Sequence, residues 1–307
     1  MLAVFVAVFA VYAWSAPRTV APEDDGEFVT VVYRHAVAHA PGFPLFVLLA
    51  EPFSWLPVGS VAFRVHLASA FFGAGACAAL WWIVRCLAGR TDIAIIAALA
   101  YGVSEVAWSQ AIIADVYALN ALLFFTVFAL TLSYCARPNV LVLPAMALIA
   151  GLGLSNHWPL FTLAMPCAAI ALFPVRRQVG RHASAGALWL AGLFILGLAP
   201  YAEMVIRSRM APELTFAGPI ASLGDFWTYV SRTGYSGVEA SATAGVDGKI
   251  RFAGFLSLEA FRQFTPAGAV LAVAGAVYSW RRQNRAIALG LIAGFAGATF
   301  LLLLQIN

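Results

Sequence analysis

Charged residues are scarce in this sequence of 307 residues. Only 10% are Asp, Glu, Lys or Arg, and lysine occurs once. Because about a quarter of the residues in a typical soluble domain are charged, the composition excludes an ordinary cytosolic enzyme and a disordered chain. It also excludes a free-standing nucleic-acid-binding protein, although the formal net charge is +4.

The familiar catalytic and nucleotide-binding motifs are missing as well. The sequence has no Walker A loop, no dinucleotide-binding glycine motif, no nucleophile elbow and no HExxH zinc motif. ATP-driven transport by this chain is therefore disfavoured. The four cysteines lie in apolar runs or at their ends without metal-ligand spacing, which indicates packing residues rather than a disulfide framework or a zinc site.

Apolar residues, in contrast, make up 63% of the chain, and the mean hydropathy is +0.88. Apolar runs of about 17–25 residues need a bilayer as their solvent. We therefore predict an all-α integral membrane protein, a polytopic helical bundle of about nine spans that forms a single transmembrane domain over residues 1–307. The predicted spans are 1–16, 61–86, 93–108, 116–136, 139–156, 159–174, 185–202, 266–280 and 286–305.

Two connections between these spans are long and polar. The first is residues 17–60, and its segment Phe43 to Leu56 is apolar but interrupted by two prolines and a glutamate. This segment is too short to span, which favours an interfacial or re-entrant position. The second long connection is residues 203–265, where charges, prolines and a Ser/Gly-rich stretch argue against a span.

The arginines predict the orientation, because short cytoplasmic connections are enriched in basic residues. Nine arginines lie in alternate short connections, which we assign to the cytoplasmic side. Thirteen of the fourteen carboxylates fall on the opposite face, with Asp92 as the exception. We therefore expect the chemistry at the extracytoplasmic face. The nine arginines are Arg85, Arg90, Arg137, Arg176, Arg177, Arg181, Arg281, Arg282 and Arg285.

The first outer connection carries the densest acidic cluster of the sequence. Glu23, Asp24, Asp25 and Glu27 lie within five residues, directly after a membrane helix. Carboxylates at a membrane surface suit a general base or a cation site. A solvated acidic loop is the structural alternative.

Two histidines follow, His35 and His39, four residues apart. A pair at this spacing can share a helix face and bind a metal ion, but Pro41 predicts that any helix ends near His39. We therefore favour a hydrogen-bonding role for His39 in a polar pocket over metal binding.

Two further connections place polar residues at the ends of spans. Asp115 and Tyr117 begin the span 116–136, where Asp115 is either a helix cap or a site residue and Tyr117 is either an interface aromatic or a site residue. Asn156 and His157 stand between two spans. They point into a shared cavity or simply form a helix turn.

Three arginines on the outer face run against the charge bias: Arg64, Arg207 and Arg209. Guanidinium groups bind phosphate in bidentate fashion, so these residues are candidates for holding a lipid phosphate. Extension of the side chains toward lipid headgroups is the alternative.

Five segments in this order resemble one family. The sequence is similar to the DUF2723 family of bacterial polytopic proteins, which includes the eukaryotic transmembrane protein 260. That family is itself similar to the protein O-mannosyltransferases and the wider GT-C glycosyltransferases. The resemblance covers most of the first 240 residues. The segments are Asp24–Phe28, His39–Leu45, Ala114–Tyr117, Gly153–Trp158 and Gly218–Tyr235.

The resemblance implies a GT-C-like fold and a catalytic carboxylate in the first outer loop. The family motif reads Asp-Ser/Cys-Gly-Glu, so Asp24 and Glu27 match its acids, and Asp25 replaces the Ser or Cys. Asp115 stands where the family usually has Glu. The implied catalytic residues are Asp24 and Glu27, the substrate-binding residues are Asp25, His39, Asp115, Tyr117, Asn156 and His157, and the lipid-phosphate residues are Arg64, Arg207 and Arg209.

The resemblance also implies the substrates. We expect a sugar, with mannose as a candidate, to move from a polyprenyl-phosphate carrier to a hydroxyl acceptor on protein or glycan, with inversion at C1. No cofactor is required, although a divalent metal is compatible with the acidic cluster. The expected location is the bacterial inner membrane, with the site facing the periplasm or exterior. Because the sequence ends at a span, we expect a fragment or a short member of the family.

Two rival hypotheses stay open at this point. A polytopic transporter or lipid flippase fits the hydropathy equally well, but it predicts functional polar residues near the membrane midplane and internal repeats. We find no repeat, and the polar segments gather at one face. A non-catalytic scaffold predicts an acidic loop that tolerates substitution.

Overall fold

The computed structural model describes residues 1–216, 218–235, 245–282 and 285–304. Within these residues all regular structure is helical, apart from one isolated parallel bridge between Val37 and Thr215. The prediction of an all-α protein is confirmed. In a bilayer this is expected, because a helix satisfies its backbone polar groups internally.

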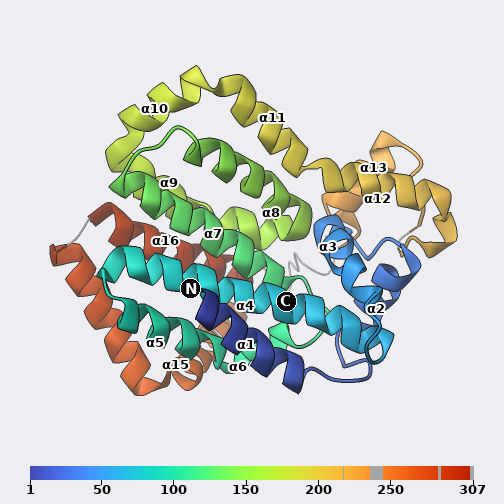
Figure 1. Ribbon diagram of the computed structural model, residues 1–307, viewed down its shortest axis with the longest axis horizontal. Helices are drawn as coiled ribbons and strands as arrows, with labels where there is room; N and C mark the ends of the chain where they lie inside the picture. The colour runs from blue at the N-terminus through green and yellow to red at the C-terminus, as the bar shows by residue number, and fades with distance from the viewer. Residues whose placement is uncertain (217, 236–244, 283–284, 305–307) are drawn as a thin grey trace.

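A long helix, α4 (Val61–Ala88), forms the centre of the bundle, and α1 (Leu2–Ser15), α5 (Thr91–Gly102) and α7 (Tyr117–Ala136) pack around it (Figure 1). Its ends follow local rules, because the Ser60 side chain accepts the Phe63 N–H and Gly89 ends the helix in the left-handed region. Small residues along α4 allow close approach: a Cβ at Gly73 would lie 2.6 Å from Ala111.

The second layer consists of α8 (Val142–Ala164), α9 (Pro166–Leu172), α11 (Ala187–Gly197) and α16 (Arg285–Leu304). Helix α8 breaks at His157, whose backbone is not helical. A Cβ at Gly153 would collide with the ring of Phe161, eight residues later. A straight helix would separate these positions by about 12 Å, so the chain folds back at His157, between the predicted spans 139–156 and 159–174.

A smaller group of helices lies together at one end of the bundle, at the right of Figure 1. It contains α2 (Asp25–Arg34) and α3 (Pro44–Ser54) from the first long connection, with α12 (Ala199–Met210) and α13 (Leu223–Val230). The remaining elements are α6 (Glu105–Ala111), η1 (Phe173–Val175), α10 (Arg176–Ala185), η2 (Pro212–Leu214), η3 (Thr233–Tyr235) and α15 (Val246–Arg282).

Three helices of the described residues are long and apolar enough to cross a membrane, and up to six spans result if each bent helix pair counts as one. The nine predicted spans are not confirmed. One reason is that α1 is short, with 14 residues. The other is bending: α5 and α6 meet at 68°, and α15 bends by 99° where Thr265 leaves the helical region.

One prediction about the long connections stays a prediction and one needs correction. Most of the segment Phe43–Leu56 forms α3, and half of its side chains are buried, with α2, α4, α8 and α12 packed against the helix; its interfacial or re-entrant position remains a prediction. The second connection was predicted to run to residue 265, but α15 begins at Val246. Part of the Ser/Gly stretch 231–248 lies outside the described residues.

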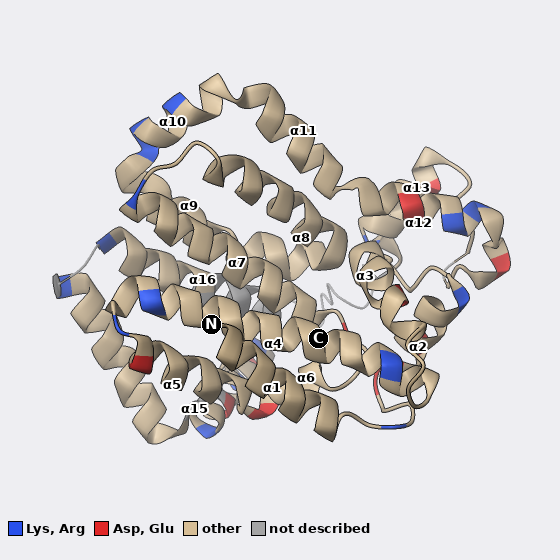
Figure 2. Ribbon diagram, viewed as in Figure 1, with Lys and Arg blue, Asp and Glu red and all other residues tan. Residues whose placement is uncertain are grey.

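Charge is distributed unevenly along the bundle. Figure 2 shows basic segments on α10 and at nearby helix ends, and a mixture of basic and acidic segments at the opposite end, which carries α2 and α13. The basic end agrees with the arginine-rich connections predicted from the sequence. The membrane side of each end remains a prediction, since it depends on the basic-residue rule.

Candidate active site

Asp24 lines the site directly before the first residue of α2. It is the N-cap of that helix, yet its side chain makes no capping hydrogen bond. About 60% of the side chain is exposed. A carboxylate at this position is favoured by the positive end of the helix dipole and is left available for chemistry.

Asp25, the next residue, has the opposite environment. Its side chain is completely buried and accepts three hydrogen bonds, from the Ala21 N–H (2.7 Å), the Ala114 N–H (2.6 Å) and the His66 ring (2.8 Å). The other ring nitrogen of His66 lies 2.9 Å from the carbonyl oxygen of Pro17. Asp25 therefore joins the start of α2 to α4 and to the loop that carries Asp115.

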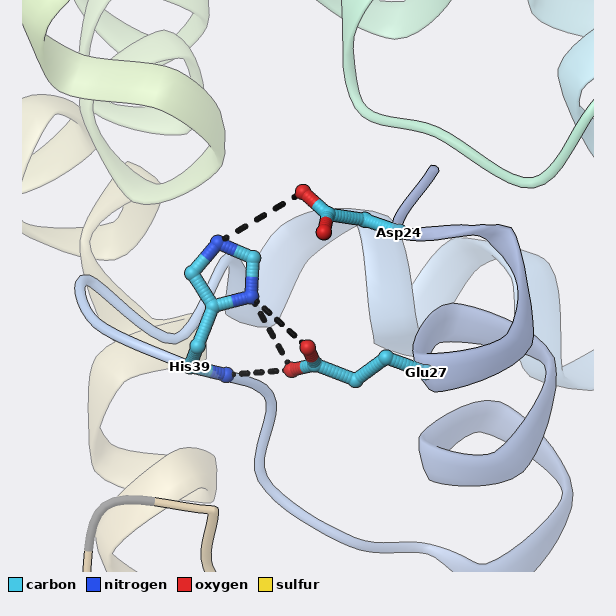
Figure 3. A group of neighbouring side chains, drawn as sticks. All are labelled: Asp24, Glu27 and His39. Atoms are coloured by element: carbon cyan, nitrogen blue, oxygen red, sulfur yellow. Dashed lines mark hydrogen bonds and ion pairs between the residues drawn. The ribbon is translucent and has the colours of Figure 1, made fainter. Parts of the chain in front are cut away.

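His39 lies between two carboxylates, as Figure 3 shows. Its Nδ1 is 3.0 Å from both oxygens of Glu27, and its backbone N–H donates to Glu27 Oε1 at 2.6 Å. Its Nε2 faces Asp24 Oδ2 at 3.9 Å. Glu27 thus fixes the orientation of the imidazole, and the ring presents its second nitrogen to Asp24.

Asp115 contributes a second buried carboxylate from the loop between α6 and α7. It is 4% exposed, and its Oδ1 accepts the Val116 N–H at 2.6 Å. Burial raises the pKa of Asp115 to about 7, the Val116 N–H opposes this increase, and the charges of Asp24 and Glu23 add to it. Asn156 supports the same loop, since its Nδ2 donates to the Val116 carbonyl at 3.1 Å.

The break in α8 brings His157 to the site. Its Nδ1 accepts the Leu160 N–H at 3.3 Å, so the side chain caps the helical segment that follows. Its ring stacks on Phe43 with centroids 5.6 Å apart and lies at the same distance from the ring of Tyr117. These aromatic rings form one wall of the site.

These groups surround a cavity of about 390 Å³. Glu27 lies behind His39, outside the lining, and Asp25 and Asn156 support the site without lining it. The lining residues are Asp24, Phe28, His39, Phe43, Asp115, Val116, Tyr117, His157, Pro159, Leu160 and Arg232.

The sequence analysis missed Arg232, which is the one Lys or Arg in the described lining of this cavity. It follows α13 with a left-handed backbone, φ 60°. The available signal was its position in the family-like segment Gly218–Tyr235. Arg232 thus adds a cation to a cavity whose other polar lining consists of two acids, two histidines and the Tyr117 side chain.

The three arginines predicted for a lipid phosphate lie outside this lining. Arg64 donates to the carbonyl oxygens of Ser54 (2.7 Å) and Leu56 (3.2 Å), which fastens the end of α3 to α4. Arg207 pairs with Glu51 at 2.6 Å and also with Glu203. The exposed Arg209 donates to a loop carbonyl at 3.4 Å.

One group of metal-ligating side chains occurs among the described residues. Asp24, Glu27 and His39 each offer a ligand atom, and these atoms lie within 4.8 Å of one another. No other cofactor-binding group emerges from the described residues. Chemically, the cavity offers an exposed carboxylate, an oriented imidazole, a buried acid and a guanidinium.

Comparison with known proteins identifies the family. A family model described as "Protein O-mannosyl-transferase TMEM260 N-terminal domain" matches residues 24–180, so the match begins at Asp24. "Protein O-mannosyl-transferase TMEM260" of Mus musculus is 32% identical over 239 residues, which are 76% of this chain and 34% of the mouse protein. "Protein O-mannosyl-transferase tmem260" of Dictyostelium discoideum is 26% identical over 119 residues, which are 38% of this chain and 14% of that protein.

The chain thus spans about a third of the length of the mouse relative. No solved structure matches it. The matched region contains most of the cavity residues, and the resemblance predicted from the motifs is confirmed. The chain belongs to the TMEM260 N-terminal domain family.

Proposed function

We propose that this chain is a membrane glycosyltransferase that moves mannose from a polyprenyl-phosphate carrier to a hydroxyl group of a protein or glycan at the extracytoplasmic face. One observation carries the proposal: the exposed carboxylate of Asp24 lines a cavity that is also lined by Asp115 and Arg232. The family supports it, because the relatives found are named protein O-mannosyl-transferases.

The proposed reaction is a single displacement. The acceptor hydroxyl oxygen attacks C1 of the sugar, and Asp24 takes the hydroxyl proton. The bond between C1 and the phosphate oxygen breaks, and its electron pair leaves with the polyprenyl phosphate. Attack from the face opposite the leaving group inverts the configuration at C1.

Asp25 positions the catalytic carboxylate and does not bind sugar in this account. Both of its oxygens accept hydrogen bonds, and its side chain has no exposed surface. It holds residue 24 at the cavity entrance by fixing the first turn of α2. Asn156 acts similarly on the loop of Asp115.

Arg232 is the group we assign to the donor phosphate, in place of the three arginines predicted from the sequence. It lines the cavity with Asp24, and a guanidinium suits a phosphodiester anion. Arg64 and Arg207 do not line this cavity, and both hold α3. His39, Asp115, Tyr117 and His157 remain as hydrogen-bonding or stacking groups for the sugar.

A second cavity supports a lipid-linked donor. It has a volume of about 630 Å³ and a mainly apolar lining from α1, α4, α5, α6, α7 and α15. Tyr117 lines both cavities, so the two spaces adjoin at this residue. A polar space beside an apolar one suits a substrate with a phosphate-sugar head and a hydrocarbon tail.

The test is transfer of radiolabelled mannose from polyprenyl-phosphate mannose in membranes that contain the chain. Protein and lipid fractions are counted separately, with membranes lacking the chain as the control. Label that depends on the chain supports the proposal and identifies the acceptor class. Absence of chain-dependent label, together with carrier flipping in liposomes, would favour a flippase instead.

A further inference from the structure

The arrangement of Asp24, Glu27 and His39 is suited to more than proton transfer by Asp24. Glu27 engages Nδ1 of His39 through both carboxylate oxygens, at 3.0 Å each (Figure 3). A carboxylate accepts hydrogen bonds, so the N–H of the neutral ring is at Nδ1. The lone pair is then on Nε2, the atom that faces Asp24.

This is the arrangement by which proteins prepare a histidine to bind a metal. A metal-binding histidine usually donates its other ring N–H to a carboxylate, which fixes the tautomer and the orientation. Here Glu27 supplies that contact, and its second hydrogen bond, from the His39 backbone, fixes both residues further.

The separation of the two remaining ligand atoms fits one ion. His39 Nε2 and Asp24 Oδ2 are 3.9 Å apart. An ion bonded at about 2.1–2.2 Å to each of two donors accommodates donor separations of roughly 3.0–4.3 Å, for bond angles from a right angle to a straight line. Asp24 is also 60% exposed, so an ion bound to it would be accessible to a ligand from outside.

The charge of the site gives an independent reason for a cation. The cavity and its immediate support contain the carboxylates of Asp24 and Glu27, the buried acid Asp115 and the guanidinium of Arg232. Under the proposed function, this excess of acids has to admit a phosphodiester anion. A divalent ion would neutralise the repulsion and offer free positions to the phosphate, which is how Mg²⁺-type ions are usually held by one or two carboxylates plus substrate phosphates.

We propose that Asp24 Oδ2 and His39 Nε2 bind a divalent cation of the Mn²⁺ class, with Glu27 orienting His39, and that this cation receives the donor phosphate while Asp24 Oδ1 stays available for the acceptor proton. The first part depends only on the site geometry. The second part rests on the proposed function.

The test uses the purified full chain in detergent, stripped with a chelator and titrated with Mn²⁺ alone. Electron paramagnetic resonance counts the bound ion, and its echo-modulation spectrum detects ¹⁴N from a directly bound imidazole. We expect one saturable Mn²⁺ per chain with ¹⁴N modulation. Asp24→Asn and His39→Gln should each weaken binding by at least about tenfold, and His39→Gln should also abolish the modulation.

The matched control is His35→Ala, because His35 lies nearby but pairs with Glu51 at 2.8 Å instead of joining the cluster. It should bind Mn²⁺ as the wild type does. Thermal unfolding of each variant shows that it is folded. The cation site is overturned if the wild type binds no Mn²⁺, binds it without ¹⁴N modulation, or binds it equally well in both cluster variants.

Mannosyl transfer measured on the same samples separates the two proposals. Mn²⁺ binding as expected without any transfer leaves the cation site standing and contradicts the proposed function. Undiminished transfer by metal-stripped wild type that also binds no Mn²⁺ overturns the cation site and leaves the proposed function standing.

Discussion

The adjacent residues Asp24 and Asp25 should have different roles, one in catalysis and the other in stability, and this difference can be measured. Asp25→Ala removes the acceptor of three hydrogen bonds, two of them buried, whereas Asp24→Asn changes a side chain that is 60% exposed and makes no capping bond. We expect the first substitution to lower stability and the second to lower activity alone.

The magnitude follows from the contacts of Asp25. Its loss leaves two backbone N–H groups and the His66 ring without their acceptor, and each unsatisfied buried donor costs about 1–3 kcal/mol. We therefore expect Asp25→Ala to lose at least about 3 kcal/mol, allowing for water that enters the space. For Asp24→Asn we expect a change of about 0.5 kcal/mol or less.

The assay is equilibrium unfolding of both variants and the wild type in the same mixed micelles. The predicted order is wild type and Asp24→Asn together, with Asp25→Ala well below. If Asp25→Ala unfolds with the wild type, the hydrogen-bond network around Asp25 does not have the energetic role that we assign to it.

Three further predictions follow from other parts of the structure. Burial raises the pKa of folded Asp115 from 3.8 to about 7, so its ionisation lowers the free energy of unfolding. The free energy of unfolding of Asp115→Asn should therefore exceed that of metal-stripped wild type by an amount that grows as pH rises from about 4 to about 7. A difference that does not change with pH argues against this. Arg232→Gln should raise the donor KM by about tenfold or more, because a charge-assisted hydrogen bond contributes about 1.5–3 kcal/mol. Arg64→Gln, in contrast, should lower the unfolding midpoint and leave KM unchanged. Equal KM values in donor titrations of the two variants contradict the assignment. Gly151→Ala should lower the free energy of unfolding by about 1–3 kcal/mol, because the added Cβ meets the backbone of α11. Gly192→Ala is the control in the same unfolding experiment. Its Cβ would enter open space, so this substitution should be neutral or slightly stabilising.

The sequence predicted the fold best where one physical signal dominated. Helices α4 and α7 begin and end within two residues of the predicted spans 61–86 and 116–136, because each is a long apolar run with polar residues at its ends. Prediction failed for the first half of α15. Its charged residues indicated a loop, but they lie on a helix that begins at Val246.

The site shows what motifs can and cannot predict. The family-like segments contained Asp24, His39, Asp115 and His157, which the structure places around one cavity. The motif selected Asp24 as the catalytic residue but placed Asp25 among the substrate-binding residues, because a motif does not contain the contact that buries Asp25 against His66, 41 residues away. Arg232 was missed since its importance comes from tertiary placement, without a motif of its own.

The central claim is that the Asp24 carboxylate takes the proton of the acceptor in mannosyl transfer. Its most direct test is kcat for Asp24→Asn, measured with polyprenyl-phosphate mannose on purified protein whose folded state has been verified by unfolding. General-base catalysis contributes about 10²–10⁴-fold, so the account predicts a loss of that size. A kcat within threefold of the wild type would contradict it.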